Sequence, residues 1–139
     1  MATVRRGFAR EIASLEEIFE FLAEFVNGQE VDERTAFCIN LVVEELFTNM
    51  VRHNVGGGDE IVLGVDRVDG QLRLELVDSE VEPFDLEAVD AVPVTAEIGD
   101  RRPGGLGIHL VRSMVDDLQY DYRTDDRQMR ISVVKKLET

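Results

Sequence analysis

The stretch from Asp32 to His53 constrains the fold most, because a helix this apolar must be covered by other parts of the chain. Asp32 is a typical N-cap residue, and the glycines at positions 56–58 end a helix soon after His53. Apolar residues occur almost all the way round the stretch: Phe37, Ile39, Leu41, Val42, Val43, Leu46, Phe47, Met50 and Val51. We therefore expect one long helix that is at least partly buried against a neighbouring layer.

One polar stripe interrupts this apolar surface. Glu45, Asn49 and His53 recur at a spacing of four and lie on one side of the helix. One interpretation is a solvated face or a capping network. The other is a site in which Asn49 gives its carbonyl oxygen to Mg²⁺ and Glu45 accepts a proton from an attacking hydroxyl or water. His53 could contact a phosphate, but a lone histidine near a helix end more often just favours the helix dipole.

A shorter helix precedes this stretch. Residues 4–12 are predicted to form an edge strand, and the sequence Ser14-Leu15-Glu16-Glu17 matches a capping box. In that motif Ser14 caps the helix and Glu17 reaches back to the N–H of Ser14. The helix is expected to end at Asn27-Gly28.

Two hairpins and one more helix complete the pattern. Residues 61–68 and 71–78 are strand-like and are joined at Asp69-Gly70, a strong type I′ turn signal. Residues 108–115 are predicted to be helical, and residues 119–123 and 129–135 form the last hairpin. This order predicts an α+β fold, a two-layer sandwich with one mixed, mostly antiparallel sheet under three helices.

Composition limits the classes of function. The chain of 139 residues is the size of a single domain, and no apolar run approaches the ~20 residues that cross a bilayer. Its net charge of −14 argues against binding to nucleic acid or anionic lipid and favours a basic protein partner. The single cysteine, Cys38, is expected to be a buried hydrophobe, and no residues have the spacing of a zinc site. These features suggest a reducing compartment, the cytoplasm.

Two further segments suggest nucleotide chemistry. Gly104, Gly105 and Gly107 directly precede the helix at 108–115, so their backbone and the helix start can approach a phosphate. Alone this signal is weak, because glycines also commonly occur in loops before helices. Asp78 ends a strand, where it could accept a hydrogen bond from an exocyclic amine of a base, although a strand-end turn residue is commoner.

The motifs occur in one order: Glu-x-x-x-Asn-x-x-x-His on a helix, Asp at a strand end, then Gly-Gly-Leu-Gly before a helix. This combination resembles the GHKL (histidine-kinase-like, or Bergerat) ATPase fold. Over its whole length the chain resembles the smallest members, the anti-sigma-factor serine/threonine kinases of the RsbW/SpoIIAB type. The stretch from Glu44 to His53 is similar to the N-box of that family, and the stretch from Gly104 to Val111 is similar to its G2 box.

The resemblance implies roles for individual residues. Glu45 would be the general base, Asn49 the Mg²⁺ ligand, and His53 a phosphate contact. Asp78 would bind the adenine amino group, with Ser132 nearby. The resemblance implies that ATP phosphates lie against the backbone of Gly104, Gly105, Leu106 and Gly107, and that residues 86–103 form the ATP lid.

The implied function is a protein serine/threonine kinase that phosphorylates a small STAS-type antagonist and sequesters a partner such as a sigma factor. A homodimer is also suggested. The G1 box of the family reads Asp-x-Gly, whereas this chain has Asp78-Ser79-Glu80. The bulk and charge of Glu80 favour the alternative, a non-catalytic protein-binding module of the same fold with weak or lost ATP binding. A catalytic half of a split histidine kinase is a third candidate, disfavoured because the chain lacks a phosphoacceptor helix pair.

Overall fold

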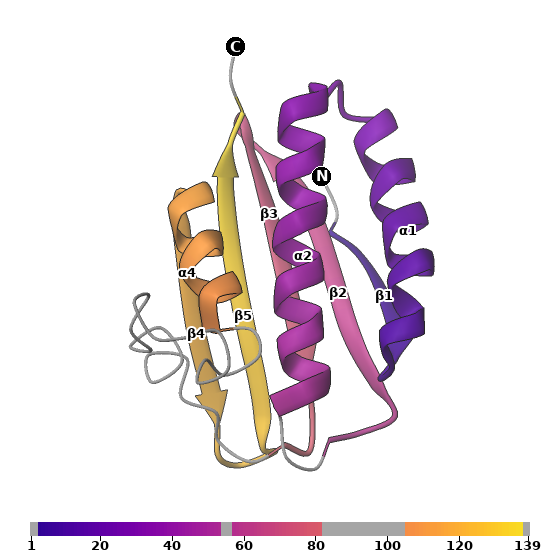
Figure 1. The fold of residues 1–139 in the computed structure, drawn as a ribbon, viewed down its shortest axis with the longest axis vertical. Coiled ribbons are helices and arrows are strands. Elements are labelled where there is room, and N and C mark those ends of the chain that lie inside the picture. Colours follow the sequence, from indigo (N-terminus) through magenta and orange to yellow (C-terminus); the bar gives the residue numbers. More distant parts are fainter. Residues whose placement is uncertain (1–2, 54–56, 82–104, 138–139) are drawn as a thin grey trace.

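A computed structural model describes residues 3–53, 57–81 and 105–137 of the chain. Figure 1 shows its helices and strands. In chain order they are β1 (Val4–Ala9), a 3-10 helix (Ile12–Ser14), α1 (Leu15–Asn27), α2 (Glu33–His53), β2 (Glu60–Val68), β3 (Gln71–Asp78), α4 (Gly105–Met114), β4 (Asp117–Arg123) and β5 (Gln128–Lys136).

The five strands form one sheet in the order β1-β2-β3-β5-β4, and all four described pairings are antiparallel. Helices α1, α2 and α4 cover one face of this sheet (Figure 1). This arrangement confirms the predicted α+β sandwich with a mostly antiparallel sheet. None of the helices in the described ranges is long and apolar enough to cross a membrane.

The core lies between the sheet and α2, as the apolar pattern of that helix predicts. Leu46 and Phe47 are 1% and 0% exposed, and Cys38 is buried as expected. Phe37 is the exception, because 67% of it is exposed. On β3 the alternate residues Leu72, Leu74, Leu76 and Asp78 are all buried. Asp78 therefore continues an apolar row on the face that the helices cover.

The β2–β3 hairpin has the predicted turn. Asp69 and Gly70 have φ values of +50° and +78°. Positive φ at both central residues is the property of a type I′ turn, whose twist matches that of the flanking strands. This turn sets the register in which Ile61 pairs with Asp78.

The predicted capping box at Ser14 is wrong. Ser14 has a helical backbone with φ of −66°, and its side chain makes no capping hydrogen bond. Its hydroxyl instead donates to the Ala9 carbonyl at 2.8 Å. Strand β1 ends at Ala9 rather than at residue 12, and the 3-10 helix leads directly into α1. The side chain of Ser14 therefore satisfies the strand end instead of the helix start.

Candidate functional site

Asn49 has a buried acceptor atom that nothing in the described residues satisfies. The residue lies on α2 and is 3% exposed. Its Nδ2 donates to the backbone carbonyl of Glu45 at 2.7 Å, which fixes the orientation of the amide. Its Oδ1 has no hydrogen-bond partner among the residues described. An unsatisfied buried acceptor costs about 1–3 kcal/mol, so Asn49 does not belong to a solvated face, and its Oδ1 is suited to a cation.

Glu45 lies one helical turn before Asn49 and is half-buried. Burial raises the pKa of Glu45 above its usual range, the charge of Glu44 raises it further, and Arg52 opposes the shift. A carboxylate with a raised pKa binds a proton more readily near neutral pH, as general-base catalysis requires. Glu45 and Asn49 thus place a carboxylate with a raised pKa and a buried acceptor oxygen on one side of α2.

Asp78 lies at the end of β3 and is fully buried. It forms an ion pair with Arg10, which follows β1. Arg10 also donates to the carbonyls of Gly58 at 3.1 Å and Met50 at 3.4 Å. Burial lowers the pKa of Arg10, although a guanidinium stays charged at neutral pH. The carboxylate is therefore held between β3, the end of α2 and the loop before β2.

The segment after Asp78 holds a residue other than glycine in a backbone conformation that favours glycine. Glu80 has a φ of +59°, in the left-handed region that favours glycine. The N–H groups of Gly57 and Gly58 donate to the carbonyls of Glu80 and Ser79 at 2.7 and 2.9 Å. The side chain of Glu80 is exposed. Glu80 thus strains the backbone rather than filling the space around Asp78.

The glycine segment differs from the prediction. Helix α4 begins at Gly105, so Gly105, Leu106 and Gly107 form its first turn instead of a loop before residue 108. The first N–H groups of a helix have no partner within it, so this turn can still bind a phosphate. The start of α4 lies at the same end of the molecule as the last turns of α2 (Figure 1). Gly104, the side chain of His53 and the expected lid at 86–103 lie outside the described residues.

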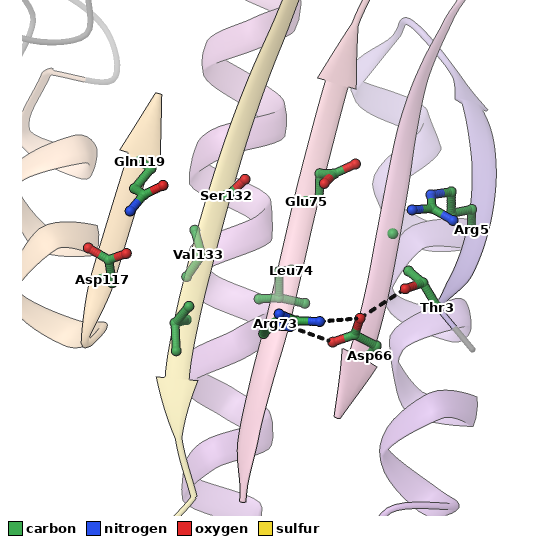
Figure 2. Close-up of a pocket in the computed structure, with 12 residues that line it drawn as sticks. Thr3, Arg5, Asp66, Arg73, Leu74, Glu75, Asp117, Gln119, Ser132 and Val133 are labelled. Carbon is green, nitrogen blue, oxygen red and sulfur yellow. Dashed lines mark hydrogen bonds and ion pairs between the residues drawn. The ribbon is translucent and has the colours of Figure 1, made fainter. Parts of the chain in front are cut away.

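The structure does not bring Ser132 to Asp78, so the prediction for Ser132 is wrong. Its neighbours in β5, Ile131 and Val133, are buried in the core, and Ser132 points to the opposite face. There it lines a groove of about 360 Å³ with Glu75 and others, on the face of the sheet away from the helices (Figure 2). The residue that pairs with Asp78 in β5 is the buried Met129.

Sequence reasoning missed Arg10 and Gly57. The arginine lies among other charges near the chain start, and nothing in the pattern indicates that it is 68 residues from its partner carboxylate. The three glycines at 56–58 were a signal, but they predict only the end of a helix. In the structure Gly57 has a φ of +106°, and a Cβ there would overlap the guanidinium of Arg10.

Comparison with solved structures finds the same fold elsewhere. The RsbU and RsbW domains of Rv1364c from Mycobacterium tuberculosis match with a TM-score of 0.71 and 13% identity, over 99% of this chain and 33% of that chain. The SiaB-SiaC complex from Pseudomonas aeruginosa matches with a TM-score of 0.52 and 11% identity, over 95% and 88%. The Acinetobacter baumannii histidine kinase AdeS matches with 0.52 and 12%, over 100% and 70%. This chain thus spans about a third of the first of these.

At such identities these structures show a shared fold. A search of curated proteins found no match. The sequence model of the histidine kinase-like ATPase domain matches residues 8–135, nearly the whole chain. This match makes the chain a member of the histidine kinase-like ATPase domain family.

Proposed function

We propose that this protein binds Mg-ATP, phosphorylates a serine or threonine of a small STAS-type antagonist, and sequesters a regulatory partner such as a sigma factor. The observation that carries the proposal is the buried Oδ1 of Asn49, which has no partner among the described residues and lies one turn from Glu45. A purely structural helix gains nothing from such an atom, whereas a cation ligand requires it.

Different residues of the site would bind the Mg²⁺ ion, the adenine and the phosphates. Asn49 would hold Mg²⁺ through Oδ1. The described ranges contain no cluster of three His, Cys, Asp or Glu side chains that could hold a metal ion. Waters and phosphates would therefore supply the other ligands. The chemistry that Mg²⁺ supplies when bound is neutralisation of phosphate charge. Asp78 would accept a hydrogen bond from the adenine amine, and the first turn of α4 would donate N–H groups to the phosphates.

Glu45 would act in the transfer step. Its carboxylate accepts the proton of the substrate hydroxyl while the hydroxyl oxygen forms a bond to the γ-phosphorus of ATP. The bond from that phosphorus to the β,γ-bridging oxygen breaks, and ADP leaves with the electron pair. The raised pKa of Glu45 suits it to this role.

The partner is proposed from chemistry and from the neighbours. One of the matching structures is a complex of two proteins, SiaB and SiaC, and another holds an RsbW domain together with an RsbU domain. The net charge of −14 favours a partner with a basic surface. The protein would act in the cytoplasm as a homodimer. Sedimentation of the purified chain would test the dimeric state.

Transfer of labelled phosphate from ATP to the cognate antagonist tests the kinase proposal. We expect the wild-type protein to label the antagonist, and Glu45→Gln to abolish labelling while it retains Mg-ATP affinity in calorimetry. Glu44→Gln is the matched control, because it removes the neighbouring carboxylate and should leave transfer within a few-fold. Undiminished transfer by Glu45→Gln would contradict the assignment of the base.

A non-catalytic binding module is the second candidate, and Glu80 is the observation that favours it. Its backbone is in the left-handed region where the family has glycine, and its exposed carboxylate adds negative charge beside a site for a polyanion. Calorimetry distinguishes the two candidates. Absence of heat with millimolar Mg-ATP, together with retained binding of a partner protein, would favour the module.

A further inference from the structure

Arg10 joins three separate parts of the fold through its side chain. The side chain is 15% exposed, and its nitrogen atoms bond the Asp78 carboxylate, the Gly58 carbonyl and the Met50 carbonyl. The backbone N–H of Arg10 also donates to the carbonyl of Asp59 at 3.0 Å. Two carbonyls therefore fix the direction in which the guanidinium meets the carboxylate.

The loop before β2 is shaped around this guanidinium. Gly57 has a φ of +106°, and any side chain there would overlap Arg10. The same loop binds the segment after Asp78, because the N–H groups of Gly57 and Gly58 donate to Glu80 and Ser79. Arg10, the loop and the end of β3 thus form one hydrogen-bonded unit.

A buried carboxylate needs this kind of support to act as an acceptor. Asp78 is fully buried, and burial without a counter-charge favours the protonated acid. A protonated acid donates through its O–H and keeps only the weaker acceptor of its carbonyl oxygen. The exocyclic amine of a base donates, so an ionised carboxylate is its stronger partner. A guanidinium keeps the carboxylate ionised and holds it in one orientation.

We propose that Arg10 is a positioning residue that holds Asp78 as an oriented, ionised acceptor, and so sets the preference of the nucleotide site for a base with an exocyclic amine. The inference rests on the proposed function, in which a nucleotide binds at Asp78. It adds that selection of the base depends on a residue more than sixty positions away in the sequence.

Calorimetry with Mg-ATP and with Mg-ITP, which carries a carbonyl in place of the amine, tests the proposal. We expect the wild type to prefer ATP by tenfold or more. Arg10→Met, similar in length but uncharged, should lose about tenfold in ATP affinity and little in ITP affinity, so the preference falls. Arg10→Lys should recover part of the preference, because the ammonium replaces the charge but not the planar set of donors.

Two outcomes would overturn the role of Arg10 alone. If Arg10→Met binds ATP more tightly, the arginine competes with the base; if it weakens ATP and ITP equally, the arginine only supports the fold. Gly57→Ala, which displaces the guanidinium and keeps its charge, should also lower the preference, so the test survives a failure of Arg10→Met to fold. A wild type that binds neither nucleotide at millimolar concentration would instead overturn the proposed function, and this inference with it.

Discussion

Replacing Glu80 by glycine should stabilise the protein, although it removes a side chain. Glu80 has a φ of +59°, and a residue with a Cβ pays about 1–2 kcal/mol in the left-handed region. Glycine avoids this cost but loses about 0.4–1 kcal/mol through the greater freedom of the unfolded chain. The carbonyl of residue 80 still accepts from Gly57 in either case. The expected net gain in the free energy of unfolding is about 0.5–1 kcal/mol.

Thermal and urea unfolding measure this gain. For a chain of this size it corresponds to a rise in Tm of roughly 2–3 °C with an unchanged m value. Glu80→Ala is the matched control, because it removes the charge and keeps the Cβ, so its stability should stay close to that of the wild type. If Glu80→Gly is no more stable than wild type, or if Glu80→Ala gains as much, backbone strain is not the cause. Under the proposed function Glu80→Gly should also bind Mg-ATP more tightly than Glu80→Ala.

Three further predictions concern single side chains. Burial raises the pKa of Glu45 in the folded protein above its value in the unfolded chain. The stability that protonation of Glu45 contributes is therefore present below the unfolded pKa and is lost as pH rises through the folded pKa. Glu45→Gln should raise Tm at pH 8 and have little effect near pH 3. The hydrogen bond from Arg73 is the main cause that lowers the pKa of Asp66 in the folded protein. The stability that ionised Asp66 contributes is therefore present above the unfolded pKa and is lost as pH falls through the folded pKa. Asp66→Asn should lower Tm at pH 7 and not at pH 2. Asn49→Leu removes a buried oxygen that has no partner among the described residues, so it should keep the free energy of unfolding within about 1 kcal/mol. Mg-dependent ATP binding should be lost in calorimetry, and unchanged binding would contradict the ligand assignment.

The sequence by itself determined the elements and the way they stack. The apolar residues of α2 can be buried only if another layer covers the helix. The alternation of Leu72, Leu74 and Leu76 decides which face of β3 packs against the helices. Asp69-Gly70 specifies its turn because few residue pairs tolerate two positive φ values. Glu45 and Asn49 could be selected from spacing alone, since the helix period is local information. Alternation also places Ser132 opposite to Ile131, a local signal that outweighs a resemblance.

The tertiary structure alone decided which groups meet. The Ser14 hydroxyl could either cap α1 or donate to the end of β1, and the position of the Ala9 carbonyl decided for the second. The pairing of Arg10 with Asp78 depends on where β1, β3 and the end of α2 converge, and no local propensity encodes a contact across 68 residues. Glu80 is the clearest case, because its left-handed backbone is imposed by hydrogen bonds from Gly57 and Gly58 against its own preference. Short-range sterics therefore determine the elements, whereas the charges of the site are paired only when the sheet and helices close around them.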